Sequence, residues 1–241
     1  ITDTNLVLDI CNGGQLSGYG LVEGEAKVVL AEDSGTQILT LPAQVAQAPY
    51  VPEGPWQIRA STPNALLIDK WQAAFAAPGL TPEKVSDPGF DFEGFLPFVM
   101  GNWEAQLPTE RSKRTYPVDL VFVARFRCAY CPDDLQLMID GFKCDRYSLY
   151  FNGYPITDTP KRSYLDAEID TVPLAGAQEG VNTLAIYMTV SGKNAGLLDM
   201  LKITGTFTVR QDKQGLYIDR PSQTLVYGDW CEQGYPFLSA M

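Results

Sequence analysis

Polar and apolar side chains alternate along several stretches in the second half of the chain. In 118–128 every second residue from Val118 to Cys128 is apolar, and these residues share one face, while the charged residues Asp119, Arg125 and Arg127 lie on the other. The stretches 181–190 and 201–209 show the same period of two. This alternation is typical of antiparallel strands with one face on a core and the other in water. The pattern therefore predicts three strands that each bury one face.

Shorter strand-like runs accompany these stretches, and turn residues separate them. The runs cover 135–139, 147–151 and 216–219. Asn152-Gly153 follows the second run and favours a type I′ hairpin turn, because both residues tolerate a positive φ. Many short strands at this spacing predict an all-β fold, namely an antiparallel β-sandwich or jelly roll.

The beginning of the chain is strand-like as well. Three apolar runs predict strands at 6–10, 26–31 and 37–41. A Pro-rich stretch, 48–55, then predicts a linker or a domain boundary. We therefore expect residues 1–50 to form a small β-unit or the end of a preceding domain, and residues 55–241 to form the sandwich.

Two segments are not settled by periodicity. The segment 65–75 suits a helix or a strand equally well. Residues 78–117 contain six of the 17 prolines and several aromatic residues, with little periodicity. A loop of this length inside a compact domain is usually functional or packs as a lid. Trp56 and Trp71 lie in apolar runs, and we expect both in the core.

Composition removes several classes of function. The chain has 241 residues and no histidine, so catalysis by a Ser-His-Asp triad and zinc sites with histidine ligands are excluded within it. Its net charge of −11 argues against a nucleic-acid partner but is compatible with a polysaccharide. The apolar runs are far shorter than the roughly 20 residues that span a membrane, so no membrane partner is expected. The chain also begins without the pattern of a signal peptide, which we expect it to lack or to have lost.

The five cysteines leave three interpretations open. They are Cys11, Cys128, Cys131, Cys144 and Cys231. Cys128-Ala-Tyr-Cys131 followed by Cys144 has part of the spacing of a zinc site. Cys128 also lies on the apolar face of a predicted strand, where a thiol packs as a small apolar group. The pattern favours buried free thiols, with one disulfide or a metal site as the alternatives.

Carboxylates gather in two places. Asp166, Glu168 and Asp170 are spaced for one strand face, and glycoside hydrolysis requires paired carboxylates. The order resembles that of laminarinase-like jelly-roll glycosidases, although theirs reads Glu-x-Asp-x-Glu and this one reads Asp-x-Glu-x-Asp. A solvent-facing acidic strand that discourages aggregation is the favoured interpretation.

A second acidic group flanks one predicted hairpin. Its members are Asp133, Asp134, Asp140 and Asp145. Calcium prefers clustered oxygen ligands, but the spacing matches no EF-hand loop, and aspartates also favour turns. We expect no cofactor, with a structural calcium site as the alternative.

Aromatic residues in predicted loops are candidates for binding a sugar. Trp103, Tyr130 and Tyr154 could stack on sugar rings, whose faces are apolar. Asn102 and Arg162 could add hydrogen bonds from neighbouring loops. Packing beneath the long loop is the alternative for Trp103 and Tyr154.

The succession of motifs between residues 145 and 209 resembles a galactose-binding-like sandwich. The matching segments are Arg146–Ile156, which contains the Asn-Gly turn, Asp166–Pro173, Gly180–Ile186, Ala195–Leu198 and Leu201–Val209. They are similar to the sugar-binding jelly roll of family 2 glycoside hydrolases and of large bacterial rhamnosidase-like proteins. Weaker matches lie at 55–58, 64–67 and 228–237.

This resemblance implies a non-catalytic module of a larger bacterial glycoside hydrolase, secreted or at the cell surface. Its partners would be a polysaccharide and the catalytic domain of the parent enzyme. Two alternatives stay open. One is a structural sandwich without a glycan site, and the other is a small glycosidase that uses carboxylates such as Glu168.

Overall fold

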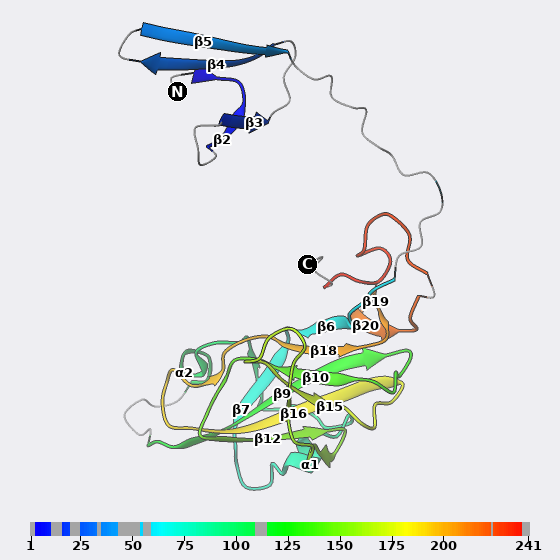
Figure 1. The fold of residues 1–241 in the computed structure, drawn as a ribbon. Coiled ribbons are helices and arrows are strands. Elements are labelled where there is room, and N and C mark those ends of the chain that lie inside the picture. The colour runs from blue at the N-terminus through cyan, green and yellow to red at the C-terminus, as the bar shows by residue number, and fades with distance from the viewer. Residues whose placement is uncertain are drawn as a thin grey trace. The chain divides into compact units, whose positions relative to one another are not determined.

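The structure of the protein is a computed structural model, which describes residues 3–10, 16–19, 25–32, 35–42, 54, 59–108, 115–222 and 224–237. The chain divides into two compact units, Ile1–Gly54 and Pro55–Met241 (Figure 1). Trp56, residues 109–114 and all of the Pro-rich stretch except Gly54 lie outside the described residues.

The first unit contains two small antiparallel sheets. One has the order β1 (Asp3–Thr4), β4 (Glu25–Glu32), β5 (Gly35–Pro42), and the other pairs β2 (Val7–Ile10) with β3 (Leu16–Tyr19). The three strands predicted in this part of the sequence are therefore confirmed as β2, β4 and β5.

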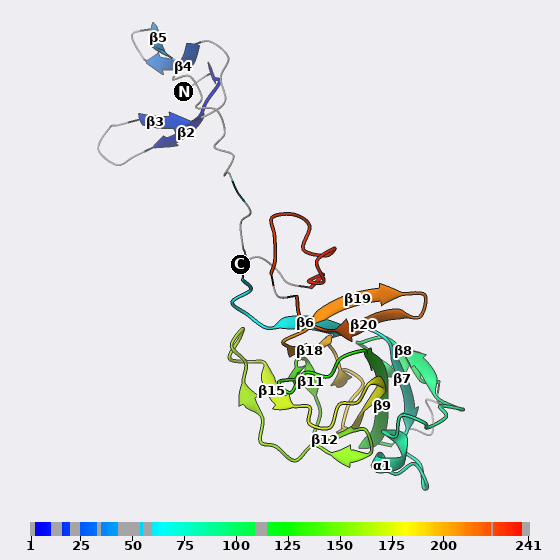
Figure 2. The same ribbon diagram turned by 90° about the vertical axis from the view of Figure 1, so that its right-hand side faces the viewer.

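The second unit is a β-sandwich whose two main sheets face each other (Figures 1 and 2). The first sheet has the order β14 (Lys161–Arg162), β15 (Asp170–Pro173), β10 (Gln136–Ile139), β18 (Leu201–Gly205), β6 (Asn64–Ile68). The second has the order β13 (Tyr154–Pro155), β12 (Arg146–Phe151), β16 (Gly180–Val190), β9 (Val118–Cys128), β20 (Gly215–Asp219), β19 (Thr208–Asp212). The second sheet also has a branch, in which β7 (Trp71–Phe75) pairs with β9 and with β8 (Leu96–Phe98). A separate two-stranded sheet pairs β11 (Phe142–Lys143) with β17 (Gly196–Leu197). The all-β antiparallel fold is thus confirmed, with β20 and β9 joined by a single parallel bridge.

The main core lies between the two sheets. Leu137 of β10 and Ile203 of β18 project from the first sheet, and Phe122 of β9 and Ile186 of β16 from the second, all of them fully buried. These are the apolar phases of the predicted strands. The alternation therefore identified the inner face of each layer.

A second apolar cluster covers the outer face of the second sheet, which the sequence did not predict. Val121 and Val123 of β9 and Ala185 of β16 are buried there beneath Val85 and Phe95. The prediction that these strands leave one face in water is wrong at their centre. The apolar side chains of the 78–117 segment pack on that face and exclude water from it.

The described part of the 78–117 segment is therefore a packed cover. It contains α1 (Pro82–Val85), β8 and α2 (Trp103–Gln106). Each helix has one turn and begins at a capping side chain, Thr81 for α1 and Asn102 for α2. The undecided segment before it forms β6 and β7, and Trp71 is buried as expected. Among the described residues, no helix is long and apolar enough to cross a membrane.

Two local predictions have opposite outcomes. The Asn152-Gly153 turn joins β12 to β13 with φ values of 48° and 88°, which confirms the predicted hairpin. The single strand predicted over 201–209 is wrong, because the chain leaves the first sheet at Gly205 and enters the second at Thr208. A strand that changes sheets keeps its alternation, so periodicity alone does not reveal the corner.

The described cysteines are free thiols. Cys128 is buried, Cys131 and Cys144 are half-buried, and Cys231 is exposed, whereas Cys11 lies outside the described residues. Burial raises the pKa of the Cys128 thiol to about 12, and the nearby Cys131 raises it further in the same direction. Cys128 therefore packs in the core as a neutral group, as predicted.

Burial of Cys128 predicts a loss of stability at alkaline pH. The folded protein holds the thiol proton more tightly than the unfolded chain. The neutral thiol therefore makes its full contribution to the free energy of unfolding below pH 9, and this contribution declines from there toward pH 12. The free energy of unfolding should fall by up to about 1.4 kcal/mol per pH unit in that window. Urea unfolding under reducing conditions at pH 8, 9 and 10 would measure it, and Cys128→Ala should flatten the slope. An unchanged slope in that variant would contradict the assignment.

Candidate functional site

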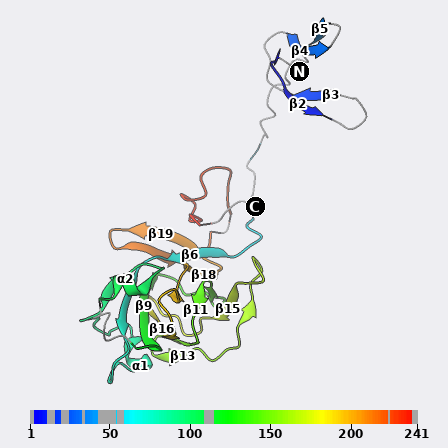
Figure 3. The same ribbon diagram turned by 90° about the vertical axis from the view of Figure 1, so that its left-hand side faces the viewer.

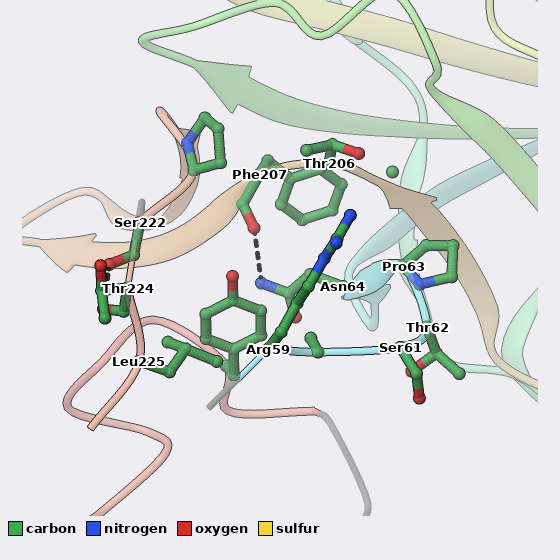
Figure 4. A pocket seen from close by; sticks show the side chains of 14 residues that line it. Arg59, Ser61, Thr62, Pro63, Asn64, Thr206, Phe207, Ser222, Thr224 and Leu225 are labelled. Atoms are coloured by element: carbon green, nitrogen blue, oxygen red, sulfur yellow. Dashed lines mark hydrogen bonds between the residues drawn. The ribbon is translucent and has the colours of Figure 1, made fainter. Parts of the chain in front are cut away.

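A cleft of about 630 Å³ opens at the end of the sandwich where β6 begins and β18 ends (Figure 4). Its lining comes from the segment before β6, the corner between β18 and β19, and the segment after β20. The lining residues are Arg59, Ala60, Ser61, Thr62, Pro63, Asn64, Gly205, Thr206, Phe207, Pro221, Ser222, Thr224, Leu225 and Tyr235. This volume lies within the roughly 300–1,000 Å³ of typical small-molecule sites.

Asn64 holds the three parts of the cleft together. Its side chain is only 2 % exposed, and Nδ2 donates to the carbonyl of Phe207 at 3.0 Å and to that of Gly234 at 2.8 Å. The backbone N–H of Val209 donates to the same Gly234 carbonyl at 2.8 Å. The C-terminal segment is thereby fixed beside the start of β6, where Figure 3 shows it.

The corner between the sheets is held by a carboxylate from a neighbouring loop. Asp134 accepts from the backbone N–H of Thr206 at 3.0 Å and from its hydroxyl at 2.6 Å. Gly205 has little space around it, since an added Cβ would lie 3.2 Å from Asp134 and from Leu135. These contacts fix the position of the chain where it changes layers, and so they fix one wall of the cleft.

The inner surface of the cleft combines hydroxyl groups with apolar rings. Phe207, Leu225 and Tyr235 are buried at its base, and burial raises the pKa of the Tyr235 phenol, which keeps it neutral. The hydroxyls come from Ser61, Thr62, Thr206, Ser222 and Thr224. Among the described residues, the lining contains no carboxylate, and Arg59 is its one charged residue.

Trp103, the foremost sequence candidate for stacking on a sugar, is fully buried. Its ring packs edge-on against Phe75 at 6.0 Å and against Tyr116 at 6.5 Å between ring centroids. The indole Nε1 donates to the carbonyl of Gly192 at 3.4 Å. Neither ring face is open to a ligand, so the structure favours the alternative of packing beneath the long loop.

The other four sequence candidates are not brought together. Asn102 caps α2 through the N–H of Glu104, and Arg162 of the edge strand β14 pairs with Asp170 of β15 at 3.0 Å. Tyr154 is 76 % exposed at the β12–β13 turn. Tyr130 lies outside the lining as well, and the guanidinium of Arg220, which precedes the lining residue Pro221, lies 5.5 Å from its ring centroid.

The three spaced carboxylates do not lie on one strand, which corrects the sequence-based expectation. Asp166 and Glu168 lie in a turn, where Asp166 accepts from the N–H of Glu168 at 2.8 Å. Only Asp170 belongs to a strand, β15. An aspartate that binds the backbone two residues ahead favours a turn over a continued ladder, which explains the interruption.

Two of the four aspartates considered for calcium have separate partners. Asp134 binds Thr206, and Asp145 accepts from the hydroxyl of Ser191 at 2.5 Å. Within the described part of the chain, no group of three or more His, Cys, Asp or Glu side chains is arranged to hold a metal ion.

Sequence reasoning missed the residues of the cleft. Arg59, Thr206 and Ser222 are ordinary surface types, and no motif marks them. The sequence pointed to this region only indirectly, because residues 64–67 and 228–237 both weakly resemble segments of the galactose-binding-like sandwich. That these two segments meet through Asn64 and Gly234 is a tertiary fact.

Comparisons with known proteins give a limited result. No protein-family model matches the chain, and no curated protein matches it. Among solved structures, it is similar to the exo-chitosanase CsxA of Amycolatopsis orientalis, with a TM-score of 0.47 and 14 % identity over 61 % of this chain and 21 % of that one.

Two further structures are similar. A β-glucuronidase from Ruminococcus gnavus has a TM-score of 0.46 and 12 % identity over 72 % of this chain and 35 % of its own. A β-glucuronidase from an uncultured Clostridium has a TM-score of 0.45 and 13 % identity over 65 % and 32 %. The chain thus spans about a third or less of these proteins. The similarity is to portions of family 2 glycoside hydrolases, at identities that concern the fold alone.

Proposed function

We propose that this chain is a non-catalytic carbohydrate-binding module of a larger glycoside hydrolase, and that the cleft at the start of β6 holds the glycan. The cleft itself carries the proposal, because it combines an adequate volume with many hydroxyl groups. Hydroxyl and amide groups can satisfy the hydrogen bonds of a sugar, and Phe207 and Tyr235 supply an apolar base. Attachment to a catalytic domain would raise the effective concentration of a weak binder.

The absence of carboxylates from the lining supports a binding role over bond cleavage. Glycosidases typically place two carboxyl groups on opposite sides of the scissile bond. The lining of the cleft, as far as the structure describes it, has none. The acidic residues considered earlier are used structurally, Asp166 in a turn and Asp170 with Arg162. We expect no release of reducing sugar by the chain, and none that depends on Glu168.

A structural role without any ligand is the second candidate, and the burial of Trp103 favours it. The ring that looked best suited to stacking serves the interior. In this role the sandwich would brace a neighbouring domain, and the cleft would hold only water.

Blocking the cleft would test binding. Ser222 is an exposed residue of the lining, so Ser222→Trp should fill part of the cleft without disturbing the core. In affinity electrophoresis against a panel of neutral and acidic polysaccharides, we expect one or more of them to retard the wild-type chain. Ser222→Trp should lower that affinity by about tenfold or more, equivalent to about 1.4 kcal/mol.

Three controls make this test selective. Ser222→Ala removes the hydroxyl without filling the cleft and should keep most of the affinity. Tyr154→Ala and Arg162→Ala change the exposed sequence candidates, which lie outside the lining, and should bind as the wild type does. Loss of binding in those two variants, with Ser222→Trp unaffected, would place the glycan elsewhere. No retardation of the wild type by any polysaccharide would favour the structural role.

A further inference from the structure

Arg59 differs from the other described residues of the cleft, because it is the one charged side chain among them. Figure 4 shows its side chain extending between Asn64 and Phe207, with Ser222 and Thr224 on one side and Thr62 on the other. The residue is exposed, so its guanidinium is open to a ligand that enters the cleft.

The other described arginines all have a partner within the protein. The partners are Asp212 for Arg127, Asp119 for Arg146, Asp170 for Arg162, the carbonyl of Phe90 for Arg125, the carbonyl of Glu232 for Arg210 and the ring of Tyr130 for Arg220. Within the described part of the chain, Arg59 alone among the arginines has no hydrogen-bond acceptor, no ion-pair partner and no ring contact for its guanidinium.

No Asp or Glu belongs to the described lining around Arg59. The exposed Asp134 contacts the lining residue Thr206, and both of its carboxylate oxygens already accept hydrogen bonds from that residue. A planar guanidinium presents paired donors that match the two oxygens of a carboxylate, and such charge-assisted pairs are stronger than neutral ones.

We infer that the cleft binds an acidic sugar unit, and that Arg59 recognises the carboxylate of a uronate. The inference rests on the proposed function, since it names the class of glycan for the same cleft. In this arrangement the hydroxyls of Thr62, Thr206, Ser222 and Thr224 contact the sugar hydroxyls. Arg59 is then the residue that determines specificity between acidic and neutral units.

The net charge of −11 bears on how an acidic glycan could bind this chain. The chain as a whole repels a polyanion, so the attraction has to come from contact in the cleft and not from the long-range field. At an ionic strength of about 0.15 M the Debye length is about 8 Å, which screens the distant charges more than a contact pair. Binding is therefore measured at that ionic strength.

A pair of matched polymers tests the inference. Polygalacturonate, alginate and hyaluronan each have a carboxyl-reduced form in which the uronate carboxylate becomes a hydroxymethyl group while the backbone is kept. We expect the full chain to bind one or more acidic forms about fivefold more tightly than the reduced form, a modest factor because Arg59 is exposed. Arg59→Gln should abolish the preference, and Arg59→Lys should retain part of it. Arg162→Gln, which removes an exposed arginine outside the cleft, should leave the preference intact.

The outcomes separate this inference from the proposed function. Equal binding of acidic and reduced polymers, or tighter binding of a neutral one, would overturn the uronate assignment and leave carbohydrate binding in place. A preference that persists in Arg59→Gln would overturn the role of Arg59. Failure of the wild type to bind any polymer, acidic or neutral, would overturn both. Far-UV circular dichroism would confirm that the variants are folded, as expected for an exposed residue.

Discussion

Replacing Trp103 by alanine is expected to lower the free energy of unfolding by about 3–5 kcal/mol, the usual cost of removing a large buried aromatic side chain. The indole is fully buried, and Phe75 and Tyr116 pack on it. Gly196 also lies close, since a Cβ added there would be 3.3 Å from the indole Cδ1. Removing the ring leaves a cavity that these neighbours can fill only in part. The shift of the urea unfolding midpoint at constant m-value would measure the loss.

Two comparisons decide what Trp103 does. Trp103→Phe should lose less stability, because most of the apolar contact is kept. Tyr154→Ala, which removes an aromatic ring that is 76 % exposed, should change stability by no more than about 0.5 kcal/mol. If Trp103→Ala kept its stability and lost glycan binding instead, the ring would be a ligand contact, as the sequence alone suggested.

Replacing Asn64 by alanine is expected to destabilise the protein by about 2–5 kcal/mol, because two buried carbonyl groups lose the hydrogen bonds that they accept from the Asn64 amide. Those carbonyls belong to Phe207 and Gly234, at 3.0 and 2.8 Å from Nδ2. The effect should be greatest in the C-terminal segment, which Asn64 connects to the sandwich. Hydrogen exchange should therefore accelerate most at residues 225–237 and at the amide of Val209, which donates to Gly234.

The Asn64→Asp variant sharpens this test, because it keeps the shape of the side chain and removes the donors. An ionised carboxylate would face two carbonyl oxygens, so folding should raise the pKa of the new carboxyl group. The folded state then binds more protons than the unfolded state, and stability should recover as the pH falls. A variant whose stability does not change between pH 7 and pH 4, relative to the wild type, would contradict this arrangement. Normal exchange of residues 225–237 in Asn64→Ala would show that other contacts hold the segment.

Local patterns in the sequence were enough to predict many of the strands. β9 has the predicted bounds, and β10, β12 and β16 begin within one residue of them. Period-two alternation is a local consequence of strand geometry, so it can be seen without knowing the partner strand. The Asn152-Gly153 hairpin was predictable for the same reason, because its φ values are a property of two adjacent residues.

Predictions that depended on distant contacts did not succeed in the same way. The outer face of β9 at Val121 and Val123 is buried by the segment 78–117, which is rich in proline and shows little periodicity in its sequence. Trp103, placed in a loop by its neighbours, is buried because Phe75 and Tyr116 meet on it. In both cases the sequence indicated the kind of residue but not what would cover it.

The sequence by itself determined that the protein is all-β, that its second half is built from short antiparallel strands, and that a chain without histidine lacks the commonest catalytic bases. Only the tertiary structure decided where a ligand could bind. The cleft is formed by residues 59–64 and 205–207, by Pro221, Ser222, Thr224 and Leu225, and by Tyr235. These segments lie up to about 170 positions apart and meet through the amide of Asn64. The physical reason is that alternation is a property of neighbouring residues, whereas a cavity and an unpaired arginine within it are defined by which distant segments the fold brings together.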